Sequence, residues 1–137
     1  MKVNNYQVWA MELFGNACYA ACISYICGND SPLDITRDIL NGVGSSYIEH
    51  SGFVSKPVEY YNSIAKEWGK PCIRDVEKPG ISSLSELPDD KDYVVEYQNG
   101  KQSHFVVANR NGVVFDPYGN SNTVRNGKPV SWRKYVF

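Results

Sequence analysis

Residues 14–28 read FGNACYAACISYICG, and this stretch decides the fold. From Ala17 to Cys27 it is rich in alanine and apolar on nearly every face, a pattern typical of a helix that is buried all round. Gly28-Asn29 supplies the stop signal. We therefore expect this helix to lie in the core. Each of its three cysteines is either a nucleophile or a small apolar side chain that fills space.

The whole chain has the size and composition of one domain. It has 137 residues, of which 42% are apolar, so a single domain over 1–137 can bury its own core. The 14 basic and 15 acidic residues give a formal net charge of −1, which argues against binding to nucleic acid. The N-terminal stretch lacks a basic region that leads into an unbroken apolar segment. We expect no signal peptide and no membrane insertion.

The four cysteines lack the spacing of a disulfide framework or a metal site. Cys18, Cys22 and Cys27 lie on one expected helix, and intrahelical geometry rarely suits a disulfide. A zinc site would need ligands from Cys72 and the two histidines, which do not have zinc-finger spacing. We expect no disulfide framework, no metal and no cofactor.

Two further helices are expected in the first half of the chain. One covers roughly residues 33–41. The other begins near Lys56-Pro57 and runs to Trp68-Gly69, with apolar residues at spacings of three and four.

The second half of the chain is expected to form an antiparallel sheet. Short segments rich in valine, tyrosine and phenylalanine alternate there with turn residues. Asn99-Gly100 and Asn111-Gly112 are typical hairpin turns, so residues 92–117 are expected to form a three-stranded meander. Helices followed by strands indicate an α+β domain, with N-terminal helices packed on a C-terminal antiparallel sheet.

Cys18 is the cysteine with a chemical reason for its position. A cysteine nucleophile needs a lowered thiol pKa, a base within reach and a third group that orients the base. Cys18 lies at the expected start of the helix, where free backbone N–H groups and the helix dipole favour a thiolate. Cys22 and Cys27 lie further along, where this effect fades, and are interpreted as core packing.

The base has two candidates, His50 in a Gly/Ser-rich loop and His104 at the start of the segment HFVVAN. We favour His104 because a strand would hold it rigidly and because Asp116 follows across the second hairpin turn. A two-residue loop would place that acid and the histidine on opposite faces of the sheet. A three-residue loop at 110–112 would pair Val106 with Asp116 and bring the carboxylate within reach of the imidazole. We predict the three-residue loop or its equivalent.

Each of these residues also has a structural interpretation. A cysteine in an alanine-rich helix is more often packing than catalysis, and a lone strand histidine is usually structural. Asp116-Pro117-Tyr118-Gly119 has the composition of an ordinary turn. The catalytic interpretation depends on the conjunction of a helix-start cysteine, a strand histidine and an acid across the hairpin, in that order.

At these residues the chain resembles the papain-like cysteine peptidases, particularly two small bacterial branches. These are the double-glycine leader peptidases of bacteriocin exporters and the secreted papain-like effectors of plant pathogens. The segment NACYAAC (16–22) is similar to their nucleophile motif, and HFVV (104–107) followed by Asp116-Pro117 is similar to their histidine strand and Asp-Pro. The resemblance spans residues 12–119 and implies a papain-like domain.

The resemblance implies a role for each member of a Cys-His-Asp triad. Cys18 would attack a carbonyl carbon, and His104 would take the thiol proton and later protonate the leaving amine. Asp116 would fix the tautomer of the imidazole.

The oxyanion site departs from the pattern of this family. The backbone N–H of Cys18 would supply one donor. The second donor in the family is a glutamine about six residues before the nucleophile, where this chain has Glu12, and an ionised carboxylate cannot donate a hydrogen bond. Gln7 and Asn16 are the substitute candidates.

Three hypotheses for the function stay open. The first is a cysteine peptidase that hydrolyses a peptide or protein substrate through a thioester acyl-enzyme. The second is a deamidase or acyltransferase toxin or effector on the same triad, with a cognate inhibitor or immunity protein as its partner. The third is a catalytically inactive papain-like binding module. The place of action stays open between the cytoplasm and export by a specialised route.

Overall fold

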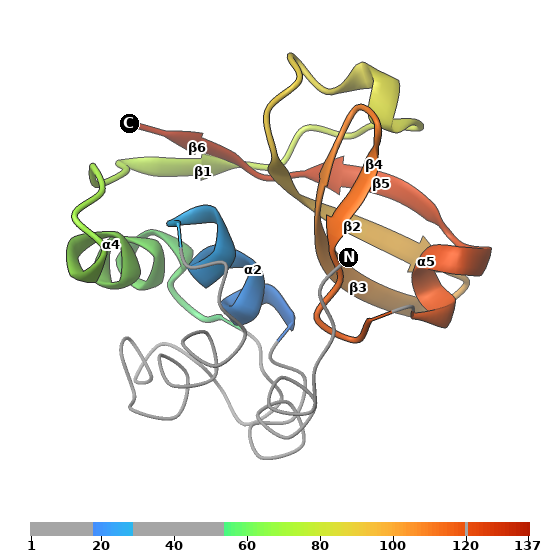
Figure 1. Cartoon of the computed structure of the whole chain (residues 1–137), viewed down its shortest axis with the longest axis horizontal. Coiled ribbons are helices and arrows are strands. Elements are labelled where there is room, and N and C mark those ends of the chain that lie inside the picture. The colour runs from blue at the N-terminus through green and yellow to red at the C-terminus, as the bar shows by residue number, and fades with distance from the viewer. Residues whose placement is uncertain (1–17, 29–53, 120) are drawn as a thin grey trace.

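The computed structural model describes residues 18–28, 54–119 and 121–137, and its elements are labelled in Figure 1. Within these residues the helices are α2 (Cys18–Ile26), α4 (Pro57–Glu67) and α5 (Asn122–Asn126), with a 3-10 helix, η2 (Leu84–Glu86). The strands are β1 (Asp75–Glu77), β2 (Tyr93–Asn99), β3 (Gln102–Asn109), β4 (Gly112–Phe115), β5 (Lys128–Trp132) and β6 (Lys134–Val136).

The predicted α+β fold, with helices first and an antiparallel sheet after them, is confirmed. The helices expected over 17–27 and 56–69 are α2 and α4. Pro57 opens α4 because the first helical position needs no N–H donor. The helix expected over 33–41 lies outside the described residues.

Two antiparallel sheets follow the helices. The larger sheet has the strand order β4-β3-β2-β5, and β1 pairs with β6 in a separate ribbon. Figure 1 shows α2 between α4 and the larger sheet, with the β1–β6 ribbon running above both helices. The meander expected over 92–117 is confirmed as β2, β3 and β4. The helix that carries Cys18 therefore packs directly on the strands that carry the expected histidine.

The core lies on both faces of the larger sheet. Six of the nine residues of α2 are buried, and this helix packs against one face through Val94, Val107 and Phe115. The opposite face buries a second apolar cluster around Val106 and Trp132. Each large side chain buried in this way stabilises the fold by roughly 1.5–3 kcal/mol, so α2 is anchored mainly by apolar contacts.

The first hairpin turn has the geometry that its glycine requires. Asn99 pairs with Gln102, which leaves Gly100 and Lys101 as a two-residue loop. Gly100 has a φ of 60°, and glycine at the first central position is typical of a type II′ turn.

The second hairpin reaches the expected register by a different route. Asn109 pairs with Gly112, so the loop has two residues and the predicted three-residue loop is wrong. The register then shifts along β4, where Ala108 pairs with Val113 but Val107 pairs with Phe115. The extra residue is a β-bulge. Beyond it, the register equals the one that a three-residue loop would have given, which is the equivalent that was expected.

A substitution at Gly127 tests how tightly the start of β5 is packed. A Cβ there would collide with the carbonyl oxygens of Thr123 and Gln98 and lie 2.8 Å from the carbonyl carbon of Gln98. We expect Gly127→Ala to lower the free energy of unfolding by about 1–3 kcal/mol, since backbone atoms must move. In the control Gly80→Ala, the new Cβ meets only the Val130 carbonyl oxygen at 3.7 Å, and the change should stay within about 0.5 kcal/mol. Urea unfolding measures both, and equal midpoints would contradict this packing.

Candidate active site

A buried histidine and a buried aspartate form the centre of the site. His104 Nε2 lies 2.6 Å from Asp116 Oδ1, and the two side chains are 2% and 0% exposed. His104 is on β3, and Asp116 directly follows the last residue of β4. The bulge in β4 brings the carboxylate toward Val106 and the histidine, so the expected bond between acid and imidazole is present.

The turn after β4 holds the carboxylate in its ionised form. Pro117 has no N–H, and the next two N–H groups that reach the carboxylate come from Tyr118, at 2.9 Å from Oδ1, and Ser121, at 3.1 Å from Oδ2. Burial alone would raise the pKa of Asp116, but its hydrogen bonds to His104 and to these N–H groups hold the pKa below its usual value. The segment that has the composition of an ordinary turn therefore also supplies the hydrogen bonds that hold the Asp116 carboxylate.

Cys18 is the first residue of α2 and influences the pKa of the same imidazole. Burial alone would lower the pKa of His104, but its hydrogen bond to Asp116 and the nearby thiol of Cys18 raise it to about 9. Nε2 is already bonded to Asp116, and Nδ1 is buried with no regular hydrogen bond to any described residue. Of the two ring nitrogens, Nδ1 is therefore the one that Asp116 does not use. Catalytic hydrogen bonds are often poorly aligned before substrate binds.

Tyr118 covers the imidazole. Its ring stacks on His104 with centroids 4.5 Å apart and an interplanar angle of 17°. Tyr118 is 40% exposed whereas His104 is 2% exposed, so the tyrosine ring covers one face of the imidazole and is itself open to solvent. Burial and the charges of Cys18 and Asp116 raise the pKa of Tyr118 to about 12. Sequence analysis missed this role, and its one local signal is an aromatic residue two positions after the acid.

The remaining cysteines are placed for packing or lie away from the imidazole. Cys22 and Cys27 are 0% and 1% exposed. Burial, followed by the charges of Cys18 and Asp116, raises the pKa of Cys22 well above its usual value, which makes it a poor nucleophile. Cys72 is exposed.

The other expected site residues lie outside the described residues. These are the alternative base and the three candidates for the second oxyanion donor, namely His50, Gln7, Glu12 and Asn16.

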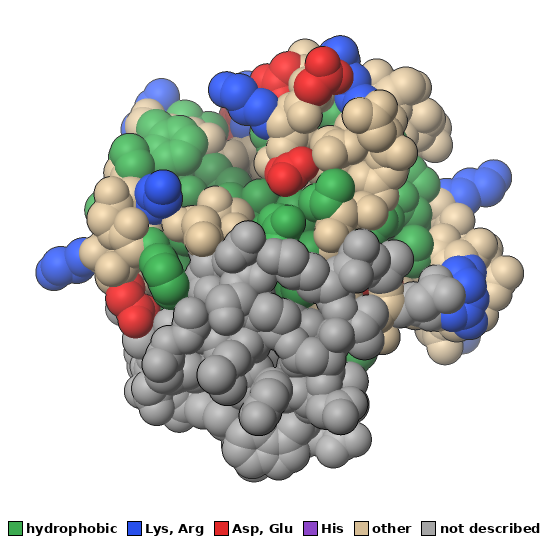
Figure 2. All heavy atoms as spheres, in the orientation of Figure 1, with side chains coloured by type: hydrophobic (Ala, Val, Ile, Leu, Met, Phe, Trp, Pro, Cys, Tyr) green, Lys and Arg blue, Asp and Glu red, His purple; other side chains and the backbone are tan. Residues whose placement is uncertain are grey.

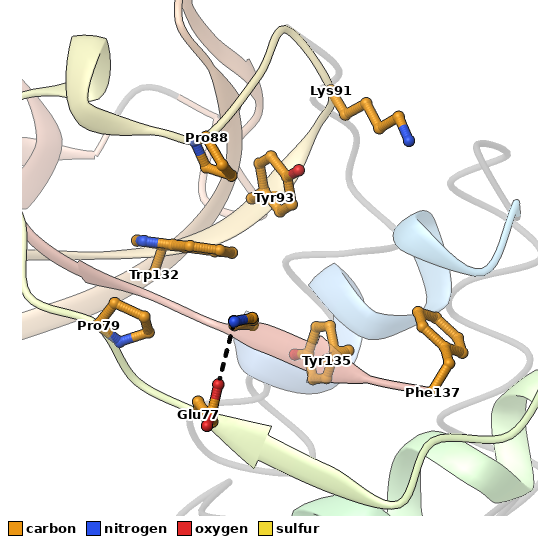
Figure 3. Close-up of a pocket in the computed structure, with 9 residues that line it drawn as sticks. Glu77, Pro79, Pro88, Lys91, Tyr93, Trp132, Tyr135 and Phe137 are labelled. Carbon is orange, nitrogen blue, oxygen red and sulfur yellow. Dashed lines mark ion pairs between the residues drawn. The ribbon is translucent and has the colours of Figure 1, made fainter.

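A hollow lies on the β1–β6 side of the molecule and contains none of the three triad residues (Figure 3). It has a volume of about 460 Å³. Tyr93 and Trp132 meet edge to face in its wall, with ring centroids 4.8 Å apart, and Glu77 pairs with Lys134 at 3.4 Å. Tyr135 also lines this hollow, and its hydroxyl bonds to a residue of α2. One side chain of this hollow therefore contacts the helix that carries Cys18.

Other ligand classes find little support in the described part of the chain. Figure 2 shows acidic and basic side chains scattered over the visible face and not gathered into a patch of one sign. Within residues 18–28, 54–119 and 121–137, no group of three or more His, Cys, Asp and Glu side chains could hold a metal ion. No helix in these ranges is long and apolar enough to cross a membrane.

Comparisons of the chain with protein-family models, with curated proteins and with solved structures give no match. What the site does is therefore inferred from its own geometry.

The pKa of His104 in the buried pair can be measured directly. We expect His104 to titrate at about pH 9 and Asp116→Asn to bring its pKa to 6.5 or below, because burial then acts with less opposition. Titration of the imidazole ¹⁵N resonances by NMR measures this, with His50→Gln to assign the second histidine. A wild-type pKa at or below 6.5 for His104 would contradict the geometry.

The same shift makes the stability of the protein depend on pH. The pKa of His104 is raised in the folded state to about 9, so protonation of this residue stabilises the fold. That contribution is fully present below about pH 6.5 and is lost as the pH rises through about 9. We expect it to amount to on the order of 3 kcal/mol. Urea unfolding of wild type and of His104→Gln between pH 6 and pH 10 isolates it, since titrating thiols contribute to both proteins. Parallel curves would show that no such contribution exists.

Proposed function

We propose that the protein is a cysteine peptidase that hydrolyses a peptide or protein substrate through a thioester on Cys18. The observation that carries this proposal is the buried 2.6 Å bond between His104 and Asp116, with Cys18 acting on the same ring. The order of the three residues along an α+β chain and the resemblance to papain-like peptidases support it.

The first half of the reaction forms the acyl-enzyme. His104 Nδ1 takes the proton of the Cys18 thiol, and the sulfur attacks the carbonyl carbon of the scissile bond. The negative charge that develops on the carbonyl oxygen needs hydrogen-bond donors, of which the backbone N–H of Cys18 is the expected first one. The tetrahedral intermediate collapses when the imidazolium gives its proton to the leaving amine. The C–N bond breaks and a thioester remains.

The second half of the reaction restores the thiol. A water molecule gives a proton to His104 and adds to the thioester carbonyl, and the carboxylic acid leaves as the sulfur takes the proton back. Asp116 stays ionised throughout, since its partners stabilise the carboxylate. It accepts Nε2–H and thereby keeps Nδ1 available as the base. The Tyr118 ring stacks on the imidazole that makes this bond.

Transfer and deamidation would use the same thioester chemistry. An amine in place of the water that attacks the thioester would give acyl transfer, and a side-chain amide in place of the peptide bond would give deamidation. The masses of the products separate these reactions from hydrolysis.

The pH dependence of Cys18 alkylation tests the proposed nucleophile. We expect iodoacetamide to modify Cys18 well below pH 7 in the wild type, because a thiolate–imidazolium pair is reactive there. In His104→Ala this reactivity should move to about pH 8.5, the range of an ordinary thiol. Exposed Cys72 serves as the internal reference in both proteins. Peptide mapping by mass spectrometry measures the rates.

The products test the reaction itself. Incubation with a mixed peptide library should give cleaved peptides that carry one added water, and Cys18→Ala should abolish them. A one-dalton gain on intact peptides would replace the peptidase proposal by deamidation, and joined peptides would replace it by transfer. If Cys18 shows no reactivity below pH 7 in the wild type, the enzyme proposals fail and the binding module remains.

A further inference from the structure

The first two residues of α2 each interact with one of two consecutive residues of β3. Cys18 acts on His104, and the next residues along each element, Tyr19 and Phe105, meet edge to face with ring centroids 4.9 Å apart and an interplanar angle of 84°. The tyrosine–phenylalanine contact therefore joins the same two elements as the proposed catalytic contact, one residue further along each of them.

The hydroxyl of Tyr19 is held from a third element. It lies 2.8 Å from the hydroxyl of Tyr135 on β6, 116 positions away in the chain. Tyr135 is itself fixed, because its ring stacks on Tyr61 of α4 at 4.7 Å and its backbone pairs with Val76 of β1. Figure 3 shows Tyr135 on β6 with a helix behind the strand. The partner of Tyr19 is thus held by contacts with both α4 and β1.

Phe105 is held on the sheet side. The guanidinium of Arg133 lies over its ring, 4.9 Å from the centroid. Arg133 in turn donates to Ser131 at 2.9 Å and pairs with Glu96 at 3.5 Å. Both aromatic partners of Tyr19 are therefore anchored by contacts that do not involve α2.

Three titratable or charged groups of the described residues act on Tyr19. They are Tyr135 on β6, Arg133 after β5 and Cys22 on its own helix. Burial raises the pKa of Tyr19 above its usual value, so the phenol stays protonated and the hydrogen bond to Tyr135 persists over the pH range in which the proposed triad would work.

We propose that Tyr19 is a positioning residue whose contacts with Phe105 and Tyr135 set the separation between the Cys18 sulfur and the His104 ring. This inference rests on the proposed function. Apolar packing of α2 on the sheet is non-directional and tolerates small sliding or rotation of the helix. A hydrogen bond is directional, and an edge-to-face ring contact has a preferred geometry. A displacement of about 1 Å between reacting groups can cost roughly 10²-fold in rate.

Removal of single hydroxyl groups tests this role. In Tyr19→Phe and in Tyr135→Phe we expect the rate of Cys18 alkylation by iodoacetamide at pH 6 to fall about tenfold, part of the loss that misplacement can cause. At pH 10, where any thiolate reacts, the rate should change less than about twofold. Tyr93→Phe is the matched control, since it also removes a 2.8 Å hydroxyl bond, to Asp89 in a different part of the fold. It should leave both rates unchanged.

Two further readouts separate positioning from general loosening of the core. The double variant Tyr19→Phe/Tyr135→Phe should lose no more than either single variant, since both changes break one bond. Buried Cys22 and Cys27 should stay protected in all of them, whereas a loosened core would expose these thiols at every pH. Labelling of those two cysteines, or additive losses, would overturn the inference.

The outcome in the wild type distinguishes this inference from the proposed function. If His104→Ala abolishes the reactivity of Cys18 at pH 6 while Tyr135→Phe leaves it intact, the proposed triad stands and the positioning role is overturned. If wild-type Cys18 is inert at pH 6, the proposed function fails and the positioning role fails with it.

Discussion

The imidazole of His104 and the carboxylate of Asp116 are buried side by side in this protein. The structure around them supplies hydrogen bonds that offset the cost of burying them. Burial of two ionised groups costs several kcal/mol per ion unless close pairing and further hydrogen bonds compensate. Here the pair is 2.6 Å apart, and two backbone N–H groups satisfy the remaining capacity of Asp116. The chain supplies these donors by turning sharply after Pro117, which brings Tyr118 and Ser121 back toward the carboxylate.

The same turn also supplies the cover of the site. A residue that donates its N–H to Asp116 places its ring on His104, so Tyr118 serves the acid through its backbone and the base through its side chain. The bulge in β4 is the other requirement, because it brings the turn toward the end of β3 where the histidine lies. A strand irregularity and a tight turn together accomplish what neither would achieve alone.

Local sequence patterns predicted the elements but not the details that join them. The alanine-rich stretch of α2 and the glycines of both hairpins carry their own signals, and the helix and the meander formed as expected. The bulge carries none, because Val114 suits a regular strand as well as a bulged one and the register is set by burial of Phe115 against α2. Agreement between the expected and observed register at Asp116 therefore came from tertiary packing and not from the loop.

The contacts that surround the proposed triad could not be predicted from sequence patterns either. Tyr19 and Tyr135 are 116 positions apart, and no periodicity links them. Tyr118 looked like a turn residue because the side-chain partner that gives it a role is on another strand. The sequence did contain the residue types that the proposed triad needs, a cysteine, a histidine and an aspartate, in an order that a fold with helices before a sheet can bring together.

The cost of the buried pair is itself an argument about function. An apolar pair of similar volume would often stabilise a core as well or better, so packing alone does not explain His104 and Asp116. Nor does packing explain why Nδ1, the ring nitrogen that Asp116 does not use, is buried without a hydrogen bond among the described residues. Buried polar groups that packing does not require, here an imidazole, a carboxylate and a thiol close together, are expected at functional sites. A purely structural cluster has no need for a thiol beside a buried histidine and aspartate, whereas the proposed triad requires all three groups.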